Sequence, residues 1–184
     1  MTLSGRTESR IRLRPATLDD RRMIYDWMAH SDLTEQMMGP PEFIDHPVPT
    51  WEDFIADYKD VHFTGEDPSQ GRSFIIELDG LPVGHINHGV LQADGTTELD
   101  IWLAARQYTG HGYGTTAIHL LCEYLSGYFG CTRFLMAPSL RNTAAVRSYM
   151  KAGFVPSEEI PEWFLPDYPD TLVMIRDEKQ RSKT

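Results

Sequence analysis

Two Asp-Gly turns near the middle of the chain constrain its fold more than any other feature. Asp79-Gly80 separates two apolar runs, residues 72–78 and 81–90, and such a short connection is a strong hairpin signal. A second turn, Asp94-Gly95, leads into the alternating segment 98–103. These turns predict that the centre of the chain is a three-stranded antiparallel meander.

Strand and helix signals flank this meander on both sides. The pattern predicts, in order, a strand over 11–15, helices that Thr17 and Thr50 cap, and after the meander a helix over 115–128, a strand over 133–137, a helix over 143–152 that Asn142 caps, and a last strand over 171–176. The apolar spacing places Tyr128 and Met150 on the buried faces of their helices. This order favours a mixed α/β (α+β) fold and argues against a doubly wound one.

Length and composition fit one globular domain. The chain has 184 residues, of which 41% are hydrophobic, enough for one substantial core. We assign residues 11–176 to this domain, and we expect residues 1–10 to be a disordered N-terminal segment and residues 177–184 a polar tail. No stretch has the length of a secretory signal core or a membrane span. The sequence therefore predicts a cytoplasmic monomer or homodimer without a membrane partner.

Charge, cysteines and histidines narrow the choice of partners. The formal net charge of −10 argues against a nucleic-acid partner and suits a cationic substrate. Cys122 and Cys131 lack Cys-x-x-Cys spacing and are predicted to be ordinary reduced thiols. His85 and His88 are three positions apart, which puts them on opposite faces of a strand, so no metal site is predicted.

A glycine-dense loop, residues 107–115, connects the last strand of the meander to the next helix. Gly110, Gly112 and Gly114 allow the backbone to approach a phosphate, and the helix that follows offers unpaired N–H groups and a positive dipole end. The spacing fits neither the dinucleotide fingerprint nor a Walker loop. Without further context, a flexible surface turn is the competing interpretation.

A second motif supplies that context. Asn142-Thr-Ala-Ala-Val-Arg-Ser-Tyr149-Met-Lys-Ala-Gly153-Phe154 follows Gln107-x-x-Gly110-x-Gly112, and the two together resemble the signatures of the GCN5-related N-acetyltransferases (GNAT) over residues 11–176. The resemblance implies a central, mostly antiparallel sheet of about six or seven strands flanked by about four helices, with two parallel strands that splay apart at an acetyl-CoA site.

The resemblance also implies which residues hold the cofactor acetyl-CoA. Backbone contacts to its pantetheine arm are expected from Trp102, Leu103 and Ala104. Contacts from the loop and the second motif are expected from Gln107, Tyr108, Thr109, Gly110, His111, Gly112, Tyr113, Gly114, Thr115 and Asn142.

The segment before the loop carries an acidic and aromatic face. Period 2 places Glu98, Asp100 and Trp102 on that face, where they are candidate contacts for the acceptor. An amine attacks a thioester only when it has lost a proton, so the reaction needs a base. In the aminoglycoside 6'-N-acetyltransferases, the nearest resemblance in the superfamily, a strand Asp just before the loop is the proposed base, and Asp100 has the matching position. For Glu98, a merely solvated strand face is an equal alternative.

Tyr149 is the candidate acid, because a phenol can protonate a departing coenzyme A thiolate. A core aromatic on an amphipathic helix is the alternative interpretation of this residue. A strand N–H near Leu103 is the candidate for polarising the thioester carbonyl.

These features predict an enzyme that transfers acetyl from acetyl-CoA to a primary amine of a small cationic substrate, by direct attack in a ternary complex. Aminoglycosides are the nearest substrate resemblance. Residues 13–27 also resemble polyamine and ribosomal-protein N-terminal acetyltransferases, and a non-catalytic acyl-CoA sensor is the alternative of a different class. Residues 45–71 and 157–170 are expected to determine acceptor specificity.

Overall fold

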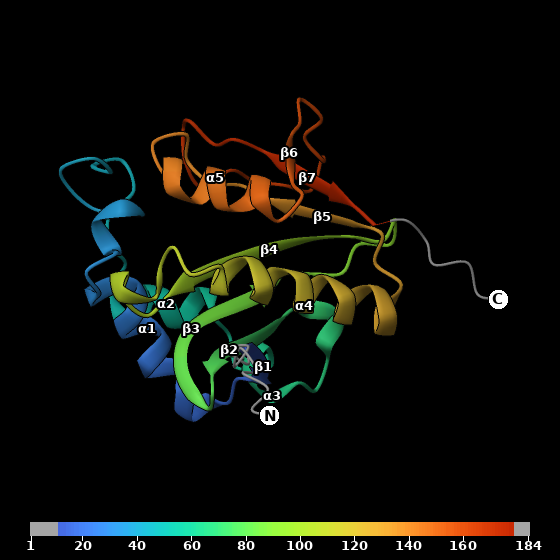
Figure 1. Cartoon of the computed structure of the whole chain (residues 1–184), viewed down its shortest axis with the longest axis horizontal. Coiled ribbons are helices and arrows are strands. Elements are labelled where there is room, and N and C mark those ends of the chain that lie inside the picture. Colours follow the sequence, from blue (N-terminus) through green and yellow to red (C-terminus); the bar gives the residue numbers. More distant parts are fainter. Residues whose placement is uncertain (1–10, 179–184) are drawn as a thin grey trace, which may run out of the picture.

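A computed structural model describes residues 11–178. Seven strands form one sheet in the order β1-β2-β3-β4-β5-β7-β6 (Figure 1). Their bounds are β1 Ile11–Pro15, β2 Arg72–Leu78, β3 Leu81–His88, β4 Thr96–Leu103, β5 Arg133–Met136, β6 Val155–Pro156 and β7 Met174–Asp177. All neighbouring strands are antiparallel except β4 and β5, which confirms the predicted mixed and mostly antiparallel sheet.

Helices cover both faces of this sheet. The α-helices are α1 Arg21–His30, α2 Trp51–Asp57, α3 Val61–Thr64, α4 Tyr113–Phe129 and α5 Thr143–Lys151, and short 3-10 turns lie at η1 Leu18–Asp20, η2 Thr34–Gln36, η3 Pro68–Gln70 and η4 Arg106–Tyr108. On one face, α4 and α5 bury Leu121 and Tyr149 against sheet residues such as Leu99. On the other face, α1 and α2 bury Ile24 and Phe54 against Ile75 and Trp102.

Local sequence explains several of these elements. Asp79 and Gly80 have φ angles of 51° and 87°, and two consecutive positive values form the tight turn that matches the twist of a hairpin. The Thr50 side chain accepts a hydrogen bond from the Asp53 backbone N–H and caps α2. The Asn142 side chain caps α5 in the same way. The predicted hairpin and the caps at Thr50 and Asn142 are therefore confirmed. Thr17 precedes the 3-10 turn η1, and the N-cap of α1 is Asp20.

The β4–β5 pair opens along its length. The two strands are in register only at Thr96, Thr97 and Glu98 of β4, and the rest of β4 has no partner on β5. Figure 1 shows the two strands separating toward the end of the sheet that carries α1 and α2. This opening is the predicted splay, and it leaves one backbone edge of residues 99–103 free.

Four details of the predicted elements are wrong. Tyr128 and Met150 are 79% and 55% exposed, because the sheet covers a narrower arc of each helix than the apolar spacing suggests. Helix α4 begins at Tyr113, inside the glycine loop, and β7 runs over Met174–Asp177, so Asp177 belongs to the sheet and not to a polar tail. The expectations for residues 1–10 and 179–184 lie outside the described residues. Within the described part, no helix is long and apolar enough to cross a bilayer.

Candidate active site

The opening between β4 and α5 contains a cavity of about 350 Å³. The glycine loop forms one wall of this first cavity, the free edge of β4 its floor and α5 the opposite wall. Of the residues predicted to hold acetyl-CoA, those that line it are Trp102, Leu103, Tyr108, Thr109, Gly110, Gly112, Tyr113, Gly114, Thr115 and Asn142. Ala104, Gln107 and His111 do not line it, and their contacts with acetyl-CoA stay a prediction.

The start of α4 is suited to bind a diphosphate. Gly112 is the N-cap of this helix with φ of 81°, a left-handed conformation that favours glycine. The first intrahelical turn begins when the Thr116 N–H donates to the Gly112 carbonyl, and the backbone N–H groups of residues 113–115 make no hydrogen bond within the described chain. Unpaired donors at a helix N-terminus attract anions, so this arrangement fits the predicted role of the loop.

The free edge of β4 offers fewer backbone groups than predicted. The Ala104 N–H donates to the Val83 carbonyl at 2.8 Å, and strand alternation directs the backbone of Trp102 to the same side, toward β3. The backbone of Leu103 therefore faces the open edge, where it can contact a pantetheine amide or the thioester oxygen. The Ile101 N–H faces that edge too, but it donates to the Asp100 carboxylate at 2.8 Å.

Sequence reasoning missed the α5 wall of the first cavity. Ala144, Ala145 and Ser148 line it together with Arg147 and Lys151. Small residues at positions i, i+1 and i+4 of one helix leave room for a ligand chain, and this spacing was the signal available in the sequence. The two cations lie on the same wall, where they can face phosphate groups.

A second cavity, of about 430 Å³, meets the first one. Met37, Ile101, Trp102, Asn142, Ala145 and Tyr149 line both cavities. The second cavity also receives His46 and Tyr58 from one predicted specificity loop and Asp167 and Tyr168 from the other. A cofactor in the first cavity and an acceptor in the second would meet beside Tyr149.

Asp100 lines the second cavity, next to Ile101 and Trp102, which line both cavities. It is exposed to solvent through the second cavity, whose walls surround it. Burial raises the pKa of Asp100 to about 6, the Ile101 N–H lowers it, the nearby Asp167 carboxylate raises it and the Tyr58 hydroxyl lowers it by a hydrogen bond. The Asn87 side-chain amide donates to the Tyr58 oxygen at 3.1 Å, which leaves the hydroxyl proton free to point at Asp100. With a pKa of about 6, Asp100 is mostly ionised at neutral pH and can accept a proton.

The other two residues of the predicted acidic face differ in accessibility. Glu98 lines the second cavity, and burial, followed by repulsion from Asp100 and Asp167, raises its pKa to about 8. Trp102 is only 6% exposed, with its ring 4.5 Å from that of His85 and 5.9 Å from that of Tyr58. Packing on these rings makes Trp102 part of the wall of both cavities.

Tyr149 is a buried residue that nevertheless lines both cavities. It is 8% exposed, and its hydroxyl makes no hydrogen bond within the described chain. Burial raises the pKa of Tyr149 above its usual value, and the Asp100 charge adds to this effect. The phenol therefore stays protonated throughout the neutral range and is available to donate toward a leaving group.

Two arginines close in sequence to the predicted motifs bind acidic residues and do not line the first cavity. The Arg106 backbone N–H and guanidinium both bind Asp32, at 2.7 Å and 2.9 Å. Arg141 binds two aspartates far from the glycine loop. His85 and His88 are both buried, on opposite faces of β3 as predicted, with His85 against Trp102 and His88 against Phe74.

Comparisons with known proteins agree with this geometry. Residues 10–155 match the family described as acetyltransferase (GNAT) domain. The chain is 29% identical over 155 residues to aminoglycoside N(6')-acetyltransferase type 1 of Klebsiella pneumoniae, covering 78% of this chain and 73% of that protein.

Solved structures share the fold. Aminoglycoside acetyltransferase AAC(6')-Ib in complex with ribostamycin and coenzyme A has a TM-score of 0.74 at 24% identity, covering 96% of this chain and 99% of that one. Spermidine N-acetyltransferase from Vibrio cholerae in complex with CoA and spermine has a TM-score of 0.68 at 18% identity, covering 91% and 95%. Because the family match spans the splayed strands and the glycine loop, the chain belongs to the GNAT acetyltransferases and is an N-acetyltransferase that uses acetyl-CoA.

Proposed function

We propose that this enzyme acetylates a primary amine of a compact polycationic small molecule, and that an aminoglycoside-like amine fits the second cavity best. The main support for this proposal is a set of acidic side chains that lack counter-ions. Asp57, Glu98, Asp100 and Asp167 line the cavity, and none of them forms an ion pair within residues 11–178. No Lys or Arg of the described chain lines this cavity.

The electrostatics of these carboxylates favour a cationic acceptor. Burial, and after it repulsion from neighbouring carboxylates, raises the pKa of Glu98 to about 8 and that of Asp100 to about 6. An ammonium group of the acceptor would stabilise the ionised forms of Glu98 and Asp100, and this attraction would favour binding of the acceptor. The formal net charge of −10 steers cations toward the site as well.

The placement of the carboxylates favours a branched polycation over a linear one. Glu98 and Asp100 lie on β4, Asp57 at the end of α2 and Asp167 on the loop before β7. Charges on three sides of one cavity match amino groups spread over a ring system. The relative that acetylates aminoglycosides, at 29% identity, supports this choice over the polyamine enzyme, which shares the fold at 18% identity.

Acetyl-CoA, when bound, supplies the acetyl group as a thioester. Asp100 accepts the proton that the attacking nitrogen loses as the N–C bond forms. Leu103 offers its N–H to the carbonyl oxygen, where negative charge develops. Tyr149 donates its hydroxyl hydrogen toward the sulfur as the C–S bond breaks, and its raised pKa makes this a hydrogen bond that strengthens with the charge on sulfur. Bulk water then takes up the proton held by Asp100.

An acceptor panel tests the proposal. Aminoglycosides, polyamines and peptides would be compared by coenzyme A release, and we expect the highest kcat/KM for an aminoglycoside. For that acceptor, kcat/KM should fall as salt rises from 0.1 to 1 M, because the Debye length shrinks from about 10 Å to about 3 Å. Asp100→Asn should lower kcat by about 10²-fold or more. A neutral or anionic best acceptor, or kcat/KM that does not change with salt, would contradict the cationic acceptor.

A polyamine as the best acceptor would select the second candidate. Spermine would then be turned over faster than any aminoglycoside, with the same salt dependence. Coenzyme A release with none of the amines would support the non-catalytic sensor.

A further inference from the structure

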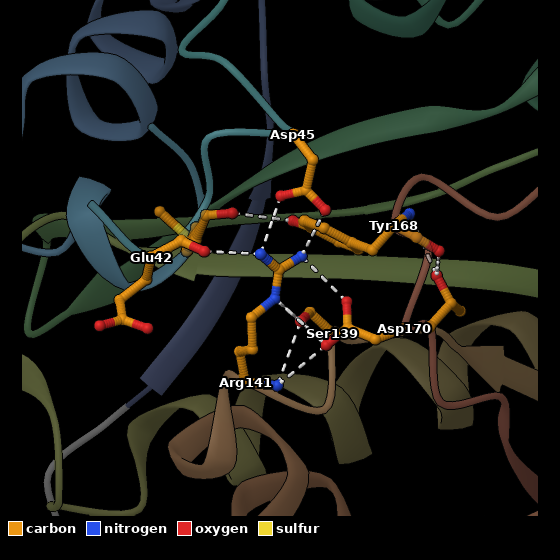
Figure 2. A network of polar contacts seen from close by, with 8 residues as sticks. Glu42, Asp45, Ser139, Arg141, Tyr168 and Asp170 are labelled. Carbon is orange, nitrogen blue, oxygen red and sulfur yellow. Dashed lines mark hydrogen bonds and ion pairs between the residues drawn. The ribbon is translucent and has the colours of Figure 1, made fainter. Parts of the chain in front are cut away.

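A cluster of polar side chains joins the segments that enclose the acceptor cavity. At its centre is Arg141, directly before the N-cap of α5. Figure 2 shows its guanidinium between the carboxylates of Asp45 and Asp170. Asp45 lies on the loop that precedes α2 and Asp170 on the loop that precedes β7, so one side chain connects three segments that are distant in the sequence.

Every nitrogen of the guanidinium donates a hydrogen bond in this cluster. Nη1 donates to Asp45 Oδ1 at 2.8 Å and to the Glu42 carbonyl at 2.6 Å. Nη2 donates to Asp45 Oδ2 at 3.0 Å and to Asp170 Oδ1 at 2.9 Å, and Nε donates to Asp170 Oδ2 and Ser139 Oγ, both at 3.2 Å. Paired bonds to two carboxylates require the planar fork of Arg, which Lys lacks.

The two sides of this bridge are anchored differently. On the Asp170 side, two backbone hydrogen bonds hold the chain independently of Arg141. The Leu140 N–H donates to the Asp170 carbonyl at 3.0 Å, and the Leu172 N–H donates to the Pro138 carbonyl at 2.8 Å. On the other side, the backbone hydrogen bonds of the tip, residues 39–46, are internal to the loop. The hydrogen bonds from Arg141 to Glu42 and Asp45 therefore connect the tip of this loop to the rest of the protein.

Tyr168 and Phe43 complete the contact between the two loops. The Tyr168 hydroxyl donates to the Met37 carbonyl at 3.1 Å, and its ring lies 4.3 Å from that of His46. The Arg141 guanidinium lies 4.4 Å from the centre of the Phe43 ring. Met37, His46 and Tyr168 all line the acceptor cavity, and Met37 lines the cofactor cavity as well. Within the 39–47 loop, His46 and Pro47 line the acceptor cavity, so the position of this loop shapes the wall of that cavity.

The charge of Arg141 is as important as its shape. Its hydrogen bonds hold the pKa values of Asp45 and Asp170 below their usual range, whereas the Asp170 charge raises the pKa of Asp45. Both aspartates are consequently ionised at neutral pH. Without Arg141, the two anions would face each other unpaired and repel the loop away from the cavity.

We propose that Arg141 is a positioning residue for the acceptor: its bridge between Asp45 and Asp170 holds the 39–47 loop against the acceptor cavity and thereby sets the KM for the acceptor. This inference rests on the proposed function, because it assumes that the second cavity binds the acceptor. Asp45, Arg141 and Asp170 do not line the cofactor cavity, so affinity for coenzyme A should not depend on the bridge.

Arg141→Gln is the test variant, with ribostamycin and spermine as acceptor probes. We expect the KM for the acceptor to rise between about 10- and 100-fold, the range for a displaced binding wall, with a smaller change in kcat. The thermal shift that coenzyme A produces should match that of the wild type. Arg14→Gln is the matched control, because Arg14 also bridges two carboxylates, Asp20 and Glu77, at 2.9 Å but lines neither cavity. Its KM should not change.

A second variant separates repulsion from general damage. Adding Asp45→Asn to Arg141→Gln removes one of the opposed charges, so the KM should move back toward the wild-type value. Amide hydrogen exchange should be faster over residues 39–47 in Arg141→Gln and unchanged over 170–173.

Three results would overturn the proposal. They are an unchanged KM in Arg141→Gln, an equal rise in Arg14→Gln, and unchanged exchange over residues 39–47. If the wild type used neither probe, the proposed function would fail by itself, and the exchange measurement would still decide whether Arg141 holds the loop.

Discussion

The Tyr58 hydroxyl lowers the pKa of Asp100, and this effect predicts a change in the pH profile that can be measured. Tyr58→Phe removes the hydroxyl and keeps the ring, which stacks on Phe54 at 4.5 Å. The hydroxyl stabilises the ionised form of Asp100, so its loss should raise the pKa of Asp100 from about 6. Because a base works only when ionised, the acid limb of kcat/KM should move to higher pH.

The size of the shift follows from the surroundings of Asp100. A hydrogen bond to a charged group contributes about 1.5–3 kcal/mol, which corresponds to roughly one to two pKa units. Water in the cavity can replace the lost donor in part, so we expect the limb to move by about one unit. At pH 6.5 the ionised fraction of Asp100 then falls from roughly 75% to roughly 25%, about a threefold loss of kcat/KM, and at pH 8.5 the loss nearly disappears.

Initial rates of coenzyme A release from pH 5 to 9 provide the assay. Tyr124→Phe is the control, because Tyr124 is a partly buried tyrosine that lines neither cavity. Its profile should overlay that of the wild type. If the acid limb of Tyr58→Phe stays at the wild-type pH, the limb belongs to the acceptor amine or another group, and the assignment of Asp100 as the base fails.

Three further predictions concern the cofactor loop, the acid and the acidic face. Gly112→Val should abolish the rise in melting temperature with coenzyme A, whereas Gly130→Val, which strains the other end of α4 at φ of 70°, should keep it; equal shifts in both would refute the loop assignment. Tyr149→Phe should lower kcat by about 10²-fold or more with an unchanged coenzyme A thermal shift, and wild-type turnover would return Tyr149 to a purely structural role. Glu98 has a folded pKa of about 8, above its usual 4.5, so its stability contribution is present below about pH 4.5 and lost as the pH rises through 8. Glu98→Gln should therefore raise the melting temperature at pH 9 but not at pH 5, and a gain that is independent of pH would show that Glu98 does not titrate in this way.

Local signals predicted much of the fold. The Asp79-Gly80 hairpin, the Thr50 and Asn142 caps and the glycine loop all depend on residues within a few positions of one another, and the structure confirms each of them. The placement of Asp100 and Tyr149 beside one cavity followed from a family motif, since the two residues lie on a strand and a helix that are not adjacent in the sequence.

The sequence by itself determined the order of the elements, the antiparallel meander and the position of the glycine loop before α4, because turn chemistry, caps and alternation act over short distances. Only the tertiary structure decided which groups surround Asp100, since Tyr58, Asn87 and Asp167 come from three separate segments. It also decided that Arg141 binds Asp45 and Asp170, and that the Ala104 N–H donates to the Val83 carbonyl of β3. The physical reason is that burial, charge proximity and the direction of a strand edge depend on how segments pack, which periodicity within one segment does not specify.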